Sequence, residues 1–188
     1  MNWSQSFYYK VRSMSSLSVT NDARNMANQL LKIAKEHLVN DGFIEPVMFF
    51  TSEDGDLVGG SIGCMMETPG LRDELASLMR SIRDKANPAM FMMVTEAWMA
   101  TVPITAESDQ LQKVLNEGAG AQEDRIEAIE VWVQTPTSHF TIIQPFDRKG
   151  DKYIDVSPDP IIMDGKIHGT ALYSRFDMWG KASQGDMQ

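Results

Sequence analysis

The segment from Ala89 to Ala100 constrains the fold more than any other part of this chain. Positions 90 to 94 hold five consecutive large apolar residues, so an extended backbone there presents apolar side chains on both of its faces. A strand of this kind has to be covered on both sides, which places it in the interior of a sheet. We therefore predict a strand near the sheet centre.

Methionines are concentrated in and around this segment. The chain has 14 of them, and six cluster in its middle: Met65, Met66, Met90, Met92, Met93 and Met99. Methionine fills irregular gaps in a core, and it also forms adaptable binding surfaces. The position of most of these residues in apolar surroundings favours the core.

Two helices are predicted before the central strand. The first begins at a cap among residues 20–22, repeats apolar residues at a spacing of four, and ends at Asp41-Gly42, where glycine adopts the left-handed conformation at low cost. The second begins with Thr68 as its cap and Pro69 in its first turn, and it ends at Asn87-Pro88. Its expected apolar face consists of Leu71, Leu75, Leu78 and Ile82.

Strand patterns occupy the rest of the chain. A hairpin is predicted from residues 43–50 and 57–62, and later strands are expected at 125–134, 139–146 and 153–156, with further short ones at 161–163 and 167–173 around Asp164-Gly165. We predict an α+β fold, in which a mostly antiparallel sheet of about five to six strands ends in a C-terminal meander. The two main helices are expected to pack on one face of this sheet.

The length of 188 residues suits one domain with loose ends. We expect a flexible, serine-rich arm without clear periodicity at residues 1–19, a single domain at 20–179 and a flexible end at 180–188. An acidic insertion loop is expected within the domain at 103–124.

Composition excludes several classes of protein. The single cysteine, Cys64, rules out an intramolecular disulfide and fits a reducing compartment. It is a candidate nucleophile, but its neighbours favour a small, half-buried apolar residue. No apolar stretch approaches the roughly 20 residues of a membrane span, and the order of aromatic and basic residues near the N-terminus does not fit a secretory signal. We expect a cytoplasmic protein that does not contact a membrane.

Charge and motifs argue against several ligands. The net charge is −9 and no basic run exceeds two residues, which disfavours binding to nucleic acid. The chain lacks a phosphate-binding loop, a dinucleotide fingerprint and paired histidines at ligand spacing. We therefore expect neither a cofactor nor a metal ion.

One loose constellation of residues has catalytic potential. Glu96 lies in an otherwise apolar strand, and burial there would raise its pKa and suit it to acid–base chemistry. His139 and Asp155 lie on predicted neighbouring strands, so the three side chains would form a one-histidine, two-carboxylate pocket. Alternatively, Glu96 faces solvent or pairs with Arg125, and His139 simply flanks a turn.

Aromatic residues near both ends are candidates for contacts with a protein partner, because such side chains bury a large area. They are Trp3, Phe7, Tyr8, Tyr9, Tyr173, Phe176 and Trp179.

Two short motifs resemble a pattern in small α+β proteins of bacterial and phage genomes. They are the run from Met93 to Met99 and, about thirty residues later, Arg125 to Ile129 followed by a hairpin; Asn40-Asp41-Gly42-Phe43 precedes them. The resemblance covers roughly residues 25–157. It implies a fold but no known activity, so it assigns no site residues.

These observations lead to two functional hypotheses. The first is a non-enzymatic accessory protein, encoded by a phage or a bacterium, that binds another protein or assembles with itself. The second is a small enzyme or ligand-binding protein with a pocket near Glu96, His139 and Asp155.

Overall fold

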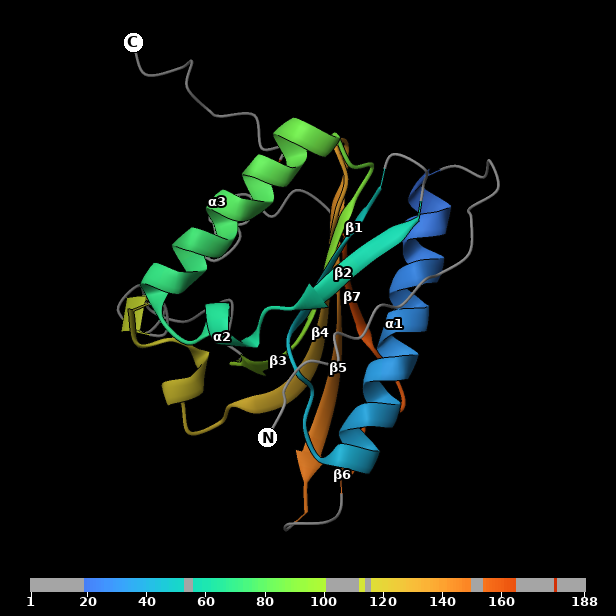
Figure 1. Cartoon of the computed structure of the whole chain (residues 1–188). Coiled ribbons are helices and arrows are strands. Elements are labelled where there is room, and N and C mark those ends of the chain that lie inside the picture. The colour runs from blue at the N-terminus through green and yellow to red at the C-terminus, as the bar shows by residue number, and fades with distance from the viewer. Residues whose placement is uncertain are drawn as a thin grey trace, which may run out of the picture.

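The computed structural model describes residues 19–52, 56–100, 112–113, 116–149 and 154–164, together with Met178. In this part of the chain a seven-stranded sheet separates two long helices (Figure 1). The helical elements are α1 (Val19–Asp41), α2 (Gly63–Met66), α3 (Pro69–Ala86) and the short 3-10 turn η1 (Ala119–Ala121). The strands are β1 (Val47–Thr51), β2 (Leu57–Ser61), β3 (Phe91–Met99), β4 (Ile126–Gln134), β5 (His139–Arg148), β6 (Ile154–Val156) and β7 (Ile161–Asp164).

The strands are ordered β2-β1-β3-β4-β5-β6, and β7 also pairs with β5. Every pair is antiparallel. Strands β6 and β7 pair with opposite ends of β5, because β6 lies opposite residues 146–148 and β7 lies opposite residues 140–143. The predicted α+β class, the antiparallel sheet and its C-terminal meander are confirmed.

The central position of β3 is also confirmed. It pairs with β1 on one side and along its full length with β4 on the other. Residues 91 to 95 of β3 are all buried. The apolar run after Pro88 therefore forms an interior strand that is covered on both faces.

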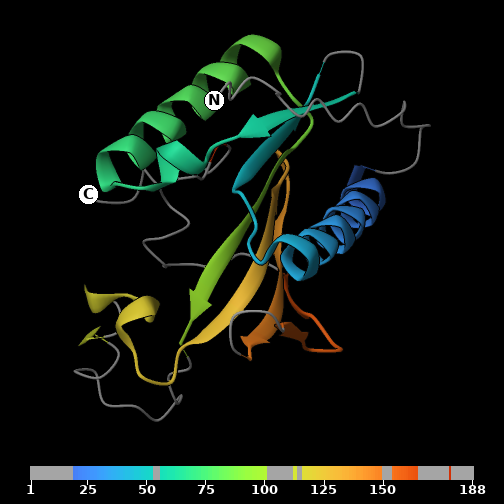
Figure 2. The same cartoon turned by 60° about the horizontal axis from the view of Figure 1, so that its bottom comes forward.

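The expectation that both helices share one face of the sheet is wrong. Helix α1 packs with Met92 and Val94 of β3, whereas α3 packs with Phe91 and Met93 on the opposite face. Figure 2, seen from another direction, likewise shows α1 and α3 on opposite sides of the sheet. The physical reason is the double-sided apolar character of β3, because a strand that is apolar on both faces needs a helix on each.

The sequence predicts the end of α1 and the start of α3, but α1 begins at Val19, before the cap predicted among residues 20–22. Helix α1 ends at Asp41, and Gly42 follows with φ +81° and an N–H donated to the Leu38 carbonyl at 3.0 Å. Helix α3 begins at Pro69 after Thr68, whose hydroxyl accepts the Leu71 N–H at 3.3 Å.

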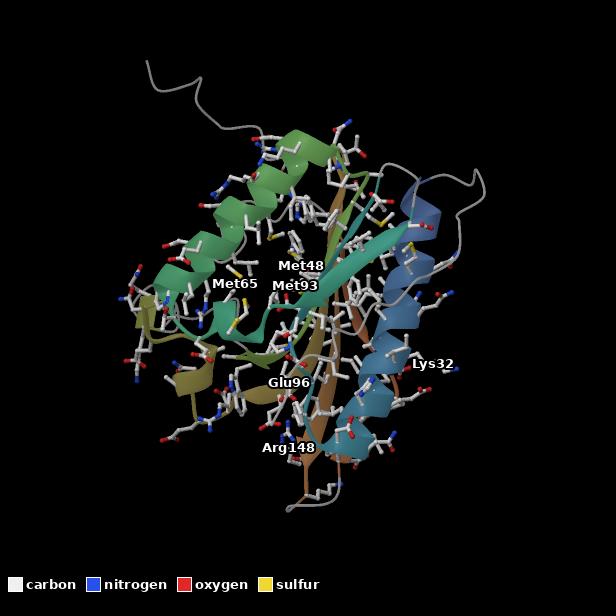
Figure 3. All side chains as sticks on the ribbon, in the orientation of Figure 1. Lys32, Met48, Met65, Met93, Glu96 and Arg148 are labelled. Carbon is white, nitrogen blue, oxygen red and sulfur yellow. The ribbon has the colours of Figure 1, made fainter. Side chains whose placement is uncertain are left out.

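Three of the six clustered methionines belong to the core. Met90, Met92 and Met93 are buried. Figure 3 shows Met48, Met65 and Met93 on the side of the sheet that faces α3, whereas Lys32 projects from the outer side of α1. The core interpretation holds for these three residues, while Met65 and Met66 are only partly buried at the edge of the α3-side core, and Met99 is partly buried at the end of β3.

A single described residue from the C-terminal part of the chain, Met178, completes the core beneath α3. Its side chain is fully buried among Leu75, Met79 and Trp132. Its N–H donates to Gln134 Oε1 at 2.9 Å, and its carbonyl accepts a hydrogen bond from the Arg83 guanidinium. Met178 therefore ties this part of the chain to α3 and β4 through two hydrogen bonds and a buried side chain.

Several predicted segments lie largely outside the described residues. These are the N-terminal arm, apart from Val19, and the end predicted at 180–188. The acidic insertion predicted at 103–124 is described only in part, and η1 lies within it.

Candidate functional site

The α1 face of the sheet changes from apolar to charged at one end. On β3 the row of side chains runs from Met92 and Val94 to Glu96, and on β4 it runs from Ile129 to Glu127. On β5 the row ends at Arg148. Side chains two residues apart share a face, so these three charged groups extend the same face as the apolar core. They meet at the end of the sheet where α1 stops.

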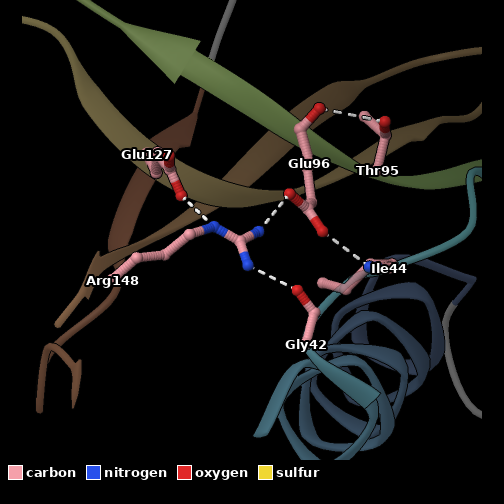
Figure 4. Close-up of polar contacts among 6 residues, drawn as sticks. All are labelled: Gly42, Ile44, Thr95, Glu96, Glu127 and Arg148. Carbon is pink, nitrogen blue, oxygen red and sulfur yellow. Dashed lines mark hydrogen bonds and ion pairs between the residues drawn. The ribbon is translucent and has the colours of Figure 1, made fainter. Parts of the chain in front are cut away.

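Arg148 is the centre of this charged cluster (Figure 4). Its Nε donates to Glu127 Oε2 at 2.6 Å and its Nη2 donates to Glu96 Oε2 at 2.7 Å. The third nitrogen, Nη1, donates to the Gly42 carbonyl. The planar guanidinium can contact several acceptors at once, which suits arginine to this position better than lysine.

Both carboxylate oxygens of Glu96 make contacts within the protein. Oε1 accepts the N–H of Ile44 at 2.6 Å, while Oε2 pairs with Arg148. Burial disfavours the charge of Arg148, but its hydrogen bond to Glu127 and the nearby charges of Glu96 and Glu127 outweigh this effect and raise the pKa of its guanidinium. The arrangement is that of an ionic clamp between the sheet and the loop after α1.

Arg125, the alternative partner expected for Glu96, makes different contacts. Its guanidinium carbon lies 4.6 Å from the ring centroid of Trp98, and its Nη1 donates to the Gly120 carbonyl at 2.8 Å. The expected pairing of Glu96 with Arg125 is therefore replaced by the pairing with Arg148. Arg125 instead holds η1 against the end of β3.

The structure does not bring Glu96, His139 and Asp155 together. Glu96 is the register partner of Ile129 on β4, and Ile129 is the register partner of Gln144 on β5. His139 lies five residues from Gln144, which is about 17 Å along an extended strand. Asp155 lies opposite Asp147, eight residues or about 26 Å from His139 along β5. Asp155 pairs with Lys149 at 2.5 Å. The hypothesis of a pocket built from these three residues is wrong, because the register places His139 at the opposite end of β5.

Cys64 lies in α2 and is exposed, so the expected half-buried position is wrong. Among the described residues, no three histidine, cysteine or acidic side chains gather in a way that would hold a metal ion. None of the helices in that part of the chain combines the length and the apolar character needed to cross a membrane.

The most unusual surface feature is β7. Its residues Ile161, Ile162 and Met163 are 46%, 49% and 38% exposed, although they lie on alternating faces of the strand. Within the described residues β7 pairs with β5 alone, and no other described strand lies along its second edge. An exposed apolar edge strand is a template for pairing with another chain.

The sequence predicts a short strand at residues 161–163 but not its exposure. The further strand predicted at 167–173 lies outside the described residues and remains a prediction. The aromatic residues proposed for partner contacts, Trp3, Phe7, Tyr8, Tyr9, Tyr173, Phe176 and Trp179, lie outside the described residues and remain a prediction.

Comparisons of this chain with models of protein families, with curated proteins and with solved structures find no match.

Proposed function

We propose that this is a non-enzymatic protein that acts through contacts with other protein chains, and that it assembles with itself through the edge strand β7. The observation that carries this proposal is the exposure of three consecutive large apolar side chains on an edge strand. Burying them against a second chain would remove apolar surface from water on both faces of the strand. A strand added at the same edge would also pair backbone groups of β7.

The opposite edge of the sheet supports the choice of β7. Strand β2 contains Gly59 and Gly60, and Val58 is its one strongly exposed large apolar residue. Glycine offers little surface to bury, so a contact at β2 would gain less apolar burial than one at β7. The contrast between the two edges favours β7 as the interface.

The charged cluster supports a non-catalytic role for its residues. The cluster is closed by hydrogen bonds, which join Arg148 to Glu96 and Glu127 and join Arg148 and Glu96 to the loop after α1. A general acid or base needs an ionisable group that is available to a substrate. Here both oxygens of Glu96 already accept hydrogen bonds from the protein.

The proposal is tested by the oligomeric state of the full chain. Light scattering coupled to size-exclusion chromatography, over a range of concentrations, should show an assembly for the unmodified protein. The double substitution Ile161→Lys with Ile162→Lys should shift it to the monomer, because charges on an edge strand oppose pairing. Leu78→Lys is the matched control, since Leu78 is 45% exposed on α3, and it should leave the assembly intact. An unmodified protein that stays monomeric at every concentration contradicts the proposal.

A further inference from the structure

Both main-chain polar groups of Met178 are bound by side chains from other elements. Its N–H donates to Oε1 of Gln134 on β4 at 2.9 Å, and its carbonyl accepts a hydrogen bond from the guanidinium of Arg83 on α3. Main-chain groups within a sheet pair instead with the main chain of a neighbouring strand. Side chains that bind the main chain of a segment, together with a pocket for one of its side chains, are typical of peptide recognition. Met178 therefore contacts α3 and β4 as the anchor residue of a docked peptide does.

Gln134 favours a peptide over a purely apolar molecule at this position. It is 5% exposed, and a buried amide oxygen carries a cost in free energy unless a donor reaches it. The Met178 N–H is such a donor. Arg83, whose side chain is about one-third exposed, supplies a charged donor for the carbonyl of the same residue. The two contacts match the N–H and C=O that every residue of a peptide except proline offers.

The side chain of Met178 enters a core that is rich in methionine. Five further methionines belong to the α3-side core with it: Met48, Met65, Met66, Met79 and Met93. Methionine is unbranched and polarizable, so it packs against apolar groups of different shapes. Surroundings of this kind favour a large, flexible apolar anchor such as methionine itself.

Five residues that pack with Met178 or bind its main chain form the Met178 site: Leu75, Met79, Arg83, Trp132 and Gln134. We propose that this site is a docking site for a linear peptide with one large apolar anchor, and that Met178 acts as its ligand within the chain. Because this ligand is covalently attached, its effective concentration is on the order of millimolar, and it excludes a separate peptide at lower concentrations. The same sequence supplied as a separate peptide binds once the attached Met178 is replaced.

The experiment uses the full-length chain with Met178→Asp, because a charged side chain is strongly disfavoured in an apolar core. The probe is a fluorescein-labelled peptide with the sequence of residues 173–183, and fluorescence anisotropy measures its dissociation constant. The control peptide carries Met178→Asn, which removes the anchor and keeps the charge. Circular dichroism verifies that the chain is folded, and Met178→Ala replaces Met178→Asp if the latter does not fold.

We expect the Met178→Asp chain to bind the unmodified peptide at least about tenfold more tightly than the unmodified chain does, because the attached Met178 no longer competes. The Met178→Asp chain should bind the control peptide at least about tenfold more weakly than the unmodified peptide, because the control lacks the apolar anchor. Equal affinities in either comparison, or no binding to the folded variant chain, overturn the proposal. If neither variant folds, Met178 is an integral part of the core and the proposal also fails.

Arg83 and Lys85 provide a matched pair of variants in the Met178→Asp chain. Arg83→Met removes the donor to the peptide carbonyl and should weaken binding by about threefold or more. Lys85→Met removes a charge from an exposed position of the same helix and should not weaken it. Equal effects of the two variants overturn the proposal.

The Met178 site and the β7 edge can be tested separately. The double lysine substitution in β7 should leave peptide binding unchanged, because the residues of the Met178 site lie on α3 and β4. Loss of peptide binding in that variant would place the peptide at β7 and overturn this inference. A monomeric unmodified protein whose Met178→Asp variant binds the peptide would contradict only the proposed function.

Discussion

Arg148 on β5 and Glu96 on β3 form an ion pair of 2.7 Å that spans the intervening strand β4. The same two residues hold the backbone on either side of Phe43, because Arg148 contacts the Gly42 carbonyl and Glu96 accepts the Ile44 N–H. The clamp thereby fixes the path of the chain from α1 into the sheet. It joins three strands and a loop that are far apart in the sequence.

Replacing Arg148 should destabilise the fold moderately. Its side chain and that of Glu96 are about one-third exposed, so solvent screens the pair. We expect Arg148→Met to lower the free energy of unfolding by about 1–2 kcal/mol, and Arg148→Lys by about half as much, because an ammonium group cannot reproduce the three contacts. Urea denaturation measures both values.

Lys149→Met is the control for this effect. Lys149 pairs with Asp155, and both side chains are about half exposed. Its replacement should change the free energy of unfolding by less than about 0.5 kcal/mol. Equal losses for the Arg148 and Lys149 variants would show that the clamp adds nothing beyond an ordinary surface pair.

Two adjacent glycines of β2 should respond oppositely to alanine. A Cβ at Gly59 would lie 2.2 Å from Phe49 Cδ1 and 2.4 Å from the Met48 carbonyl oxygen, whereas one at Gly60 would meet no atom within 4 Å. We expect Gly59→Ala to cost about 1–3 kcal/mol of stability, since the backbone at Met48 cannot easily move. Gly60→Ala should be neutral or stabilise by up to about 1 kcal/mol. Thermal unfolding of the two variants side by side measures the difference, and equal melting temperatures would contradict the packing at Gly59.

How far the sequence predicts this fold depends on the range of the interactions involved. Local signals were sufficient for the ends of the helices, as at Thr68 and Gly42, because capping depends on neighbouring residues. The double-sided apolar pattern of β3 was sufficient to place it inside the sheet. The apolar face of α3 was predicted less well, since Leu78 is exposed and Met79 is buried in its place.

The candidate site was predicted less well than the fold, because it depends on register. Glu96 was correctly singled out as a charged residue in an apolar strand, but its partner Arg148 is 52 residues away in the sequence. A shift of register between β3 and β4 would bring a different residue beside it, and the long segment that joins these two strands does not fix their register as a short turn would. The same uncertainty produced the incorrect grouping of Glu96 with His139.

Thr51 offers a test of a buried polar contact at the start of the central strand. Its hydroxyl accepts the N–H groups of Ala89 and Met90 at 2.6 and 3.3 Å, and its side chain is buried. Thr51→Val keeps the shape but removes the acceptor, so we expect a loss of about 1–3 kcal/mol. Hydrogen exchange at Ala89 and Met90 should accelerate in this variant. Thr51→Ser retains the hydroxyl but loses the methyl group, and its two amides should remain protected. Faster exchange in Thr51→Ser together with protection in Thr51→Val would mean that packing of the methyl group, not the hydrogen bonds, matters.

Met178 provides the last test, because it shows whether the C-terminal contact contributes to the stability of the whole domain. Its fully buried side chain packs with Leu75 and Met79 beneath α3, so Met178→Ala should leave a cavity there. We expect a loss of about 2–3 kcal/mol in the free energy of unfolding, measured by urea denaturation. Leu78→Ala on the exposed side of the same helix should change it by less than about 0.5 kcal/mol. A Met178→Ala protein as stable as the unmodified chain would mean that this residue unfolds separately from the domain, since a side chain that is already released at equilibrium cannot contribute to global stability.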